Sequence, residues 1–464
     1  MRSASPSPAG RYAFFLSPRL RSFLLVGAAL PLAISGVMFC TSALERGRTK
    51  LSNSVASPSR LTSQLAGSIP THDGQCLHLV SELGNVIVHT QDSGKVDYHV
   101  RLEADASQKN ARRLLKDFNI SARETPDGVH LKGHAPSVST GRLWVTLEVN
   151  VPRNYSLDVS TGGGNIETDD INGRVVLSSA GGSIMTGNID GSAHLETGGG
   201  HITVKNVSGE LVANTGGGHI TTGLIGGNAS LHTSGGHIRV ASVGGTAHLV
   251  TGGGNVSVEH SGGALVAETA GGQIEVGEAA GLVRARTGGG GIHVVRVSGP
   301  TDLQTVGGSI YLTHVDSAVK ASAAAGGITA WFVVPVKLLG NCDLQSNDGD
   351  IVVYLPRHLP VTIDAQIQMA DEHRFIVDPA FPLQVSYADS SDGSRTVRAV
   401  GSLNGGGELL QLRAVAGNIR VVLSDASKQM YIYNQQMEQL QQQIQSQLHR
   451  VEQLQHAGGD LFEP

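Results

Sequence analysis

Apolar residues recur along the middle of the chain at a fixed spacing of 18 residues. Alternating apolar and polar positions follow each of them, which is typical of β-strands. The recurring residues are Ile166, Ile184, Ile202, Ile220, Ile238, Val256, Ile274, Ile292, Ile310 and Ile328. Ten copies at one period predict a solenoid, in which each repeat forms one rung of a stack.

Each 18-residue unit contains two runs with apolar or small residues at every second position, such as Ala193, Leu195 and Thr197. We therefore expect two short strands per rung, each followed by a corner that contains glycine. Glycine suits a corner because it accepts positive φ and leaves room for the next rung. The predicted corner glycines are Gly164, Gly182, Gly200, Gly218, Gly236, Gly254, Gly272, Gly290, Gly308 and Gly326.

A hydroxyl residue stands five positions before each of the first nine recurring apolar residues. The series is Thr161, Ser179, Thr197, Thr215, Thr233, Thr251, Thr269, Thr287 and Thr305. We expect a hydroxyl ladder in which each copy bonds to its neighbours. The repeat has neither an aliphatic residue at every sixth position nor a series of carboxylates, so it favours neither a hexapeptide β-helix nor a calcium-binding β-roll.

The pattern predicts an all-β fold: a single-stranded right- or left-handed β-solenoid with 18-residue rungs. Residues 75–159 are predicted to form an N-terminal β cap with one short helix at 106–118, and residues 160–335 the regular rungs. The repeat loses its phase at an insertion in "WFVVPVKLLGN", residues 331–341, and residues 336–425 are predicted to form irregular rungs and a cap. Residues 44–74 are polar and Ser-rich, which predicts a linker.

The last part of the chain, residues 428–456, is rich in Gln and lacks Pro, and its apolar residues follow a heptad-like spacing. This predicts an amphipathic C-terminal helix, which either docks on the solenoid or joins two copies as a homo-oligomer.

The N-terminus predicts export. Four arginines precede a 19-residue apolar run, residues 23–41, which as a helix would span about 28 Å. Residues 1–43 are therefore predicted to be a transmembrane anchor or a signal peptide cleaved after Ala43. Either interpretation places the protein in the cell envelope, anchored in the membrane or in the periplasm or at the surface.

The composition narrows the function. The formal charge is −5 and basic residues do not cluster beyond the N-terminus, so nucleic-acid binding has no electrostatic support. The three cysteines, Cys40, Cys76 and Cys342, show no metal-ligand spacing. In an exported chain Cys76 and Cys342 could form a disulfide.

The stretch "LEVNVPRNYSLDVSTGGGNIE" leads into the rungs, and "DGDIVVYLP" and "VAGNIRVVLS" follow them. In this layout residues 75–425 resemble a bacterial family of putative adhesin domains, which are β-strand-repeat proteins of unknown function. The resemblance implies an envelope-associated β-solenoid and brings no catalytic residues. The chain departs from the commoner pattern because His or Asn often replaces the Asp before the recurring Ile.

The stretch "TGGGHITV", residues 197–204, resembles a phosphate-binding loop but is followed by a strand pattern and recurs on every rung. It is therefore interpreted as a corner. His201, His219 and His237 hold one position in three successive rungs and should stack. They are candidate zinc or copper ligands, but stacked rings do not converge on an ion. The sequence favours a polar ladder that faces solvent, with no metal and no cofactor.

Acidic residues are sparse in the repeat. Glu167, Asp169, Asp170 and Asp190 lie at its start and show no pairing typical of a glycosidase. We therefore predict no catalytic residues. The predicted function is a non-enzymatic, adhesin-like binding or scaffold module, with an envelope glycan or protein as its partner. The alternatives are a self-assembling envelope scaffold, joined through its ends or the C-terminal helix, and a carbohydrate-active β-helix enzyme.

Overall fold

The computed structural model describes residues 60–136, 141–333, 338–369, 377–379, 382–389 and 395–424. These residues all belong to one compact unit, Ser57–Pro464. Strands dominate this part of the chain, and its one helix is α1 (Ala111–Asp117), so the all-β prediction is confirmed. The predicted signal peptide or anchor (1–43) and the predicted Gln-rich helix (428–456) lie outside the described residues. No helix within the described ranges is long and apolar enough to span a membrane.

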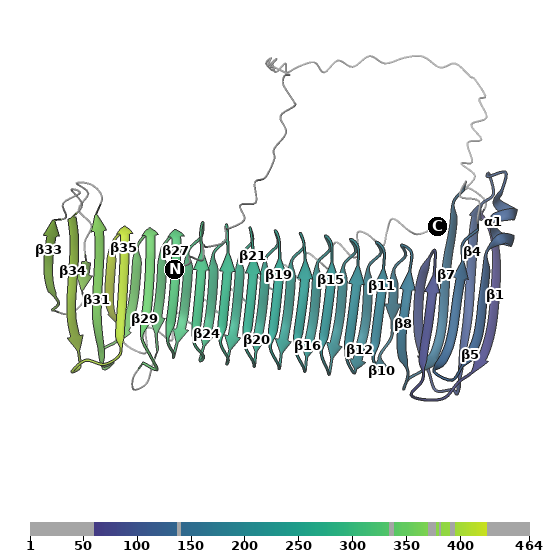
Figure 1. Ribbon diagram of the computed structural model, residues 1–464, viewed down its shortest axis with the longest axis horizontal. Coiled ribbons are helices and arrows are strands. Elements are labelled where there is room, and N and C mark those ends of the chain that lie inside the picture. Colours follow the sequence, from purple (N-terminus) through teal and green to yellow (C-terminus); the bar gives the residue numbers. More distant parts are fainter. Residues whose placement is uncertain are drawn as a thin grey trace, which may run out of the picture. The chain divides into compact units, whose positions relative to one another are not determined.

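The regular part of the chain forms two parallel sheets, and successive strands alternate between them. Figure 1 shows these strands stacked in one long row. Ile220 pairs with Ile238 in the first sheet and Ala229 with Ala247 in the second, so paired residues are 18 positions apart. The first sheet, called sheet A, contains β9 (Ile166–Thr168), β10 (Ile171–Asn172), β12 (Ile184–Asp190), β14 (Ile202–Val207), β16 (Ile220–Ile225), β18 (Ile238–Val243), β20 (Val256–Ser261), β22 (Ile274–Ala279), β24 (Ile292–Val297), β26 (Ile310–Val315) and β28 (Ile328–Phe332). The second, sheet B, contains β11 (Val175–Ser179), β13 (Ala193–Thr197), β15 (Leu211–Thr215), β17 (Ala229–Thr233), β19 (Ala247–Thr251), β21 (Leu265–Thr269), β23 (Val283–Thr287), β25 (Thr301–Thr305) and β27 (Val319–Ala325).

The core lies between the two sheets and consists of ladders of small aliphatic side chains. Ile238 and Val240 of β18 and Leu249 of β19 are at most 1% exposed. Each inward residue packs on its counterpart in the next rung, so burial of apolar area stabilises the stack one rung at a time. The large buried aromatics Tyr155 and Phe332 lie in sequence just before and at the end of these rungs.

The corner glycines are required by close approach of the rungs. A Cβ built on Gly254 would lie 1.9 Å from the carbonyl oxygen of Gly236 on the preceding rung. Of the ten corner glycines, Gly326 alone has a φ in the left-handed region, at +150°. The prediction of glycine corners therefore holds, but positive φ is not the general reason for them. The absence of a side chain is what lets successive backbones meet.

The corner threonines do not bond to one another, so the predicted hydroxyl ladder is wrong in its partners. Thr251 Oγ1 donates to Gly236 O at 2.7 Å and accepts from Gly254 N at 3.2 Å. Thr233 makes the same two bonds one rung earlier, to Gly218 O and from Gly236 N. Backbone C=O and N–H groups at a buried corner need hydrogen-bond partners, and the threonine hydroxyl supplies one for each kind of group.

The N-terminal end extends both sheets with longer strands. Its elements are β1 (Arg60–Pro70), β2 (Cys76–Ser81), β3 (Asn85–Gln91), β4 (Lys95–Asp105), β5 (Asn119–Thr125), β6 (Gly128–His134), β7 (Leu143–Pro152) and β8 (Ser156–Thr161). β1 pairs antiparallel with β4 over its full length, so residues 60–70 of the predicted linker at 44–74 form a strand; residues 44–59 lie outside the described residues. The strand was missed because small residues break its apolar face. At Gly67, for example, a Cβ would lie 2.3 Å from Tyr98 Oη, so the glycine makes room for that ring.

At the C-terminal end, an inserted segment lies in sequence between the last two rungs. The elements after β28 are β29 (Cys342–Asp348), β30 (Ile351–Pro356), β31 (Val361–Met369), β32 (Val377–Pro379), β33 (Gln384–Asp389), β34 (Arg395–Leu403), β35 (Leu409–Ala416) and β36 (Ile419–Ser424). β35 lies between β29 and β31, and β31 pairs antiparallel with β34. In sheet B, β31, β34 and β33 therefore cover the last rung.

Candidate functional site

The predicted histidine ladder exists and lies at a corner just before β14, β16 and β18. The rings of His201 and His219 stack at 4.9 Å between centroids with planes 12° apart, and those of His219 and His237 at 4.9 Å and 15°. His201 Nδ1 accepts the backbone N–H of His219 at 2.9 Å, and His219 Nδ1 accepts that of His237 at 2.9 Å. Each imidazole therefore caps the backbone amide of the next rung.

In other rungs, an asparagine at this position also accepts the backbone N–H of the next rung. Asn165 Oδ1 accepts from Ser183 N at 2.9 Å, and Asn255 Oδ1 accepts from Gln273 N at 3.0 Å. His237 Nδ1 accepts from Asn255 N at 2.8 Å, so the series runs through the histidines without a break. Since Nδ1 is an acceptor in all three histidines, the proton of each neutral ring lies on Nε2.

The central histidine of the ladder, His219, favours its neutral form. Burial, and then the neighbouring His237, His201 and Arg239, lower the pKa of His219 below its usual value. The ladder thus has a structural role, and its Nε2 atoms lie on nearly parallel rings. That His201, His219 and His237 form a polar ladder without a metal ion stays a prediction, and a tetrahedral ion would need donors that converge.

Three of the four acidic residues named at the start of the repeat, Asp169, Asp170 and Asp190, bind a nearby polar group. Asp169 Oδ2 lies 3.1 Å from His89 Nδ1, and Asp190 Oδ1 accepts from Ser208 Oγ at 2.7 Å. Asp170 accepts from the backbone N–H and the side-chain amide of Asn188, and these bonds lower the pKa of Asp170. A general acid needs a raised pKa, so Asp170 is poorly suited to that role.

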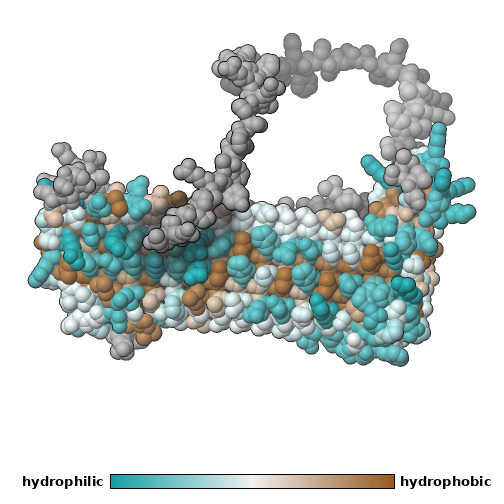
Figure 2. Space-filling model, in the orientation of Figure 1, coloured by the Kyte–Doolittle hydropathy of each residue, from teal (hydrophilic) through white to brown (hydrophobic). Residues whose placement is uncertain are grey.

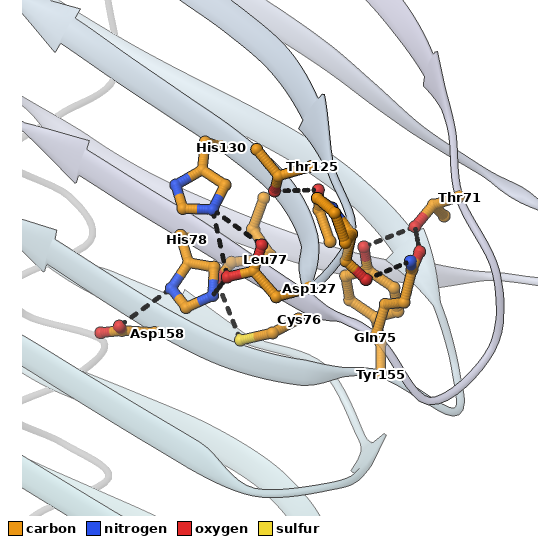
Figure 3. A network of polar contacts seen from close by, with 12 residues as sticks. Thr71, Gln75, Cys76, Leu77, His78, Thr125, Asp127, His130, Tyr155 and Asp158 are labelled. Carbon is orange, nitrogen blue, oxygen red and sulfur yellow. Dashed lines mark hydrogen bonds and ion pairs between the residues drawn. The ribbon is translucent and has the colours of Figure 1, made fainter.

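A second polar cluster, which the sequence analysis missed, lies at the N-terminal end on the outer side of sheet B (Figure 3). We call it the His–Asp cluster: His78 on β2, Asp127 in the turn before β6, and His130 on β6. The two rings stack at 4.5 Å between centroids with planes 21° apart. The Nε2 atoms of both histidines lie 3.4 Å from Asp127 Oδ2. These three side chains bring their donor atoms within 4.8 Å of one another.

Two neighbours hold the His–Asp cluster in place. Asp158 on β8 has Oδ2 3.1 Å from His78 Nδ1, so His78 lies between two carboxylates. The turn that carries Asp127 lies close to β2: a Cβ built on Gly128 would lie 1.9 Å from Cys76 O, so only glycine fits there. The nearby Thr125 side chain is the main cause that lowers the pKa of Asp127, and His130 adds to it.

A signal for this cluster was present in the sequence. The stretches "CLHLVS", "GVHLKG" and "SLDVST" share one pattern, with a polar residue between two apolar ones. β2 pairs in parallel with both β6 and β8, which puts His78 beside His130 and Asp158. The pairing joins residues 52 and 80 positions apart in sequence, so the 18-residue period did not reveal it.

The thiols of Cys76 and Cys342 are unpaired in the structure. Burial, and then the nearby Asp158 and Asp127, raise the pKa of Cys76 to about 11. Burial raises the pKa of Cys342 to about 11 as well. Cys76 lies on β2 and Cys342 on β29, at opposite ends of sheet B, so the disulfide that the sequence left open does not form in this structure (Figure 1).

A groove crosses the outer face of sheet B in the regular rungs. One outward position from each of five successive rungs lines it: Val250, Glu268, Arg286, Gln304 and Ser322. The groove has a volume of about 580 Å³. Arg286 lies 3.5 Å from Glu268 and 3.8 Å from Asp302, so charged groups lie along the groove. Figure 2 shows hydrophobic residues in a band along one face, bordered by hydrophilic ones.

Comparison with known proteins identifies one family model, described as Toastrack DUF4097, which matches residues 77–400. Similar solved structures include a "putative cell adhesion protein" from Clostridium sporogenes, with 7% identity, coverage of 78% of this chain and 100% of that chain, and a TM-score of 0.18. A "putative adhesin" from Parabacteroides distasonis has 10% identity, coverage of 63% and 96%, and a TM-score of 0.23. Another from Parabacteroides merdae has 14% identity, coverage of 61% and 95%, and a TM-score of 0.21. No curated protein matches the chain.

Proposed function

The chain belongs to the Toastrack DUF4097 family, and from this premise we propose that it is a non-enzymatic, adhesin-like binding module of a bacterial envelope. The observation that carries the proposal is the groove on sheet B. One column of outward side chains runs along it, and the lining residues recur every 18 positions from rung to rung. Strand spacing of about 4.8 Å makes this a line of groups at regular intervals.

Such a line suits a long and repetitive partner. Five rungs span about 19 Å, which is the length of several sugar units or of a short extended peptide. Charged, amide, hydroxyl and apolar groups all occur in the column, so it offers both hydrogen bonds and hydrophobic contact. An envelope glycan or an extended protein segment is therefore the class of partner that we propose.

Binding to envelope polysaccharides and to surface proteins tests the proposal. The purified protein is screened beside the double variant Arg286→Ala, Gln304→Ala, which alters two groups that line the groove. Arg284→Ala is the matched control, since Arg284 lies two residues earlier on β23 and does not line the groove. We expect binding that the double variant weakens at least tenfold and the control retains. Absence of binding to every tested partner, or equal binding by all three proteins, would contradict the proposal.

A self-assembling scaffold is the second candidate, and an open strand favours it. Among the described residues β33 pairs with β34 alone, and it carries Tyr387 at 70% and Val385 at 45% exposure. An exposed apolar strand at a sheet edge is a template for pairing with another chain. Analytical ultracentrifugation should show mass that rises with concentration and falls with Tyr387→Asp or on removal of residues 428–464. A monomer at every concentration would argue against assembly.

We also propose that the protein is exported to the envelope. The support is the apolar run at residues 23–41 that follows four arginines, a region outside the described residues. Cell fractionation and N-terminal sequencing of the mature protein test this. A start near residue 44 would identify a cleaved signal peptide, and an intact N-terminus in the membrane fraction would identify an anchor. Recovery in the cytosolic fraction would contradict export.

A further inference from the structure

We propose that the His–Asp cluster binds a divalent transition-metal ion of the zinc class, with His78, His130 and Asp127 as ligands. Imidazole nitrogen and carboxylate oxygen are both zinc donors, and three protein ligands with one water complete a tetrahedral site. The site is separate from the groove on sheet B, so the inference does not depend on the proposed adhesin function.

The spacing of the donor atoms supports the assignment. Zinc bonds of about 2.0–2.1 Å in a tetrahedron hold neighbouring donors about 3.3 Å apart. The Nε2 atoms of His78 and His130 each lie 3.4 Å from Asp127 Oδ2. An ion enters between these three atoms when the two stacked rings turn until their Nε2 atoms converge. Both side chains lie at the surface, with 28% and 31% of their area exposed, so this turn needs no change in the core.

The surrounding residues form the second shell that a metal site needs. A ligating histidine usually donates its other ring N–H to a carboxylate, which fixes the tautomer and the direction of the ring. Asp158 Oδ2 accepts in this way from His78 Nδ1 at 3.1 Å, which leaves Nε2 free for the ion. Thr125 Oγ1 donates to Gly128 O at 2.8 Å and so fixes the turn from which Asp127 extends.

The histidine ladder is a natural comparison, because it also contains stacked imidazoles. In His201 and His219 the Nδ1 atom accepts a backbone amide. Within the part of the chain that the structure describes, no Asp or Glu forms an ion pair with His201, His219 or His237. The carboxylate is therefore what distinguishes the two histidine pairs. We assign the metal to the cluster rather than to the ladder.

A bound ion would tie together two segments that are distant in sequence: β2, and the hairpin of β5 and β6 with its turn. These segments lie at the N-terminal end of sheet B, where β5 is the last strand. Binding to the folded chain alone stabilises it by mass action. The ion would thus stabilise this end of the stack.

Zinc titration of the full chain, purified without a polyhistidine tag, tests the assignment. Isothermal titration calorimetry should give one Zn²⁺ per chain for the wild type. Binding should be at least tenfold weaker in His130→Ala and in Asp127→Asn, which removes the charge at nearly constant shape. Asp158→Asn should weaken binding about tenfold through the second shell. His219→Ala, in the ladder, should bind like the wild type.

A second readout guards against variants that lose binding because they unfold. Circular dichroism should show the same strand content in every variant, and Co²⁺ should give visible absorption bands of a tetrahedral site in the wild type and in His219→Ala only. The proposal is overturned if the wild type binds no stoichiometric Zn²⁺, since the cluster is then an ion-pair network. Equal affinity in the wild type, His130→Ala and Asp127→Asn also overturns it, as does a loss confined to His219→Ala.

Discussion

The regular rungs and the N-terminal end use the same strands for different purposes. At the corners of the rungs the same polar groups recur every 18 residues, and their partners are backbone groups: Thr251 bonds to Gly236 O, and His219 accepts an amide. At the N-terminal end, side chains with no counterpart meet, as His78 does with Asp127 and Asp158. Repetition along a solenoid therefore indicates structure, and departure from it indicates where to look for specific chemistry.

The largest expected effect comes from filling a corner in the regular rungs. In Gly254→Ala the new Cβ would lie 1.9 Å from Gly236 O, so two backbones must separate. We expect the free energy of unfolding to fall by about 3 kcal/mol or more, as for severe overpacking. Urea denaturation followed by circular dichroism measures it.

The adjacent glycine is the control for this substitution. A Cβ on Gly253 would lie 3.9 Å from its nearest neighbour, Gly235 O, so Gly253→Ala should change the free energy of unfolding by about 1 kcal/mol or less. If both variants lose the same free energy of unfolding, the close approach of the rungs is not the reason for glycine at Gly254.

Loss of a corner hydroxyl should have the next largest effect. Thr251→Val keeps the shape of the side chain but leaves Gly236 O and Gly254 N without the bonds they now share with Thr251 Oγ1. Buried unsatisfied groups cost about 1–3 kcal/mol in the free energy of unfolding. Chemical denaturation of Thr251→Val and of Thr251→Ser, which retains the hydroxyl, measures this. A larger loss in Thr251→Ser than in Thr251→Val would contradict the assigned role.

At the N-terminal end a comparable loss should stay local. Tyr155 is fully buried, and its hydroxyl lies 2.6 Å from Thr71 Oγ1, which also donates to Gln75 Oε1 at 2.7 Å (Figure 3). Tyr155→Phe removes one of these bonds, at a cost of about 1 kcal/mol. Hydrogen exchange should accelerate near the turn at Gly74 and remain unchanged in the rungs from β14 to β24. Faster exchange throughout those rungs would show that the two regions are energetically one unit.

A different threonine in the rungs should respond with the opposite sign. Thr222 points into the core from β16, and its buried Oγ1 makes no hydrogen bond among the described residues. Valine occupies the paired positions on both sides, at Val204 and Val240. Thr222→Val should therefore raise the free energy of unfolding by about 1 kcal/mol, since a poorly satisfied hydroxyl leaves the core. Thermal denaturation measures the change, and a loss of stability would mean that the hydroxyl has a stabilising partner.

Much of the regular region could be predicted because every rung has the same inward apolar positions and the same glycine corners at a fixed spacing. The 18-residue spacing predicted the strands and the glycine corners, and it placed His201, His219 and His237 in one stack. It did not predict the partner of the threonine hydroxyl, because backbone carbonyls carry no signal in the sequence. Positive φ was the wrong reason for the corners, since close approach of the rungs depends on the three-dimensional stack.

The N-terminal end was harder to predict because its contacts are neither repeated nor local. β1 was taken for a linker, since Ser and Gly interrupt its apolar face and its partner β4 lies beyond two other strands. The His–Asp cluster depends on β2 lying between β6 and β8, an order that the chain sequence does not reveal. Single copies of a residue also give no periodic signal, however well they are placed for chemistry.

The smallest expected effect concerns the protonation of the histidine ladder. His219 Nδ1 accepts the amide of His237, and protonation would remove that acceptor. The pKa of His219 is lowered in the fold, mainly by burial, whereas in the unfolded chain it is near 6.5. Below about pH 6.5 the unfolded chain therefore takes up a proton that the folded chain binds less readily. The contribution of His219 to stability is complete above this pH and declines as the pH falls toward the folded pKa.

His219→Asn separates this titration from the structural role of the ladder. Asn255 already accepts an amide through Oδ1 at the same position, so the substitution should leave the melting temperature at pH 8 nearly unchanged. Between pH 7 and pH 5 the variant should lose less stability than the wild type, because asparagine does not titrate. His248→Asn, on the outer face of β19, provides a control outside the ladder. If wild type and His219→Asn lose stability equally over this range, the acid sensitivity arises elsewhere. Protonation of His219 then does not change the stability of the protein.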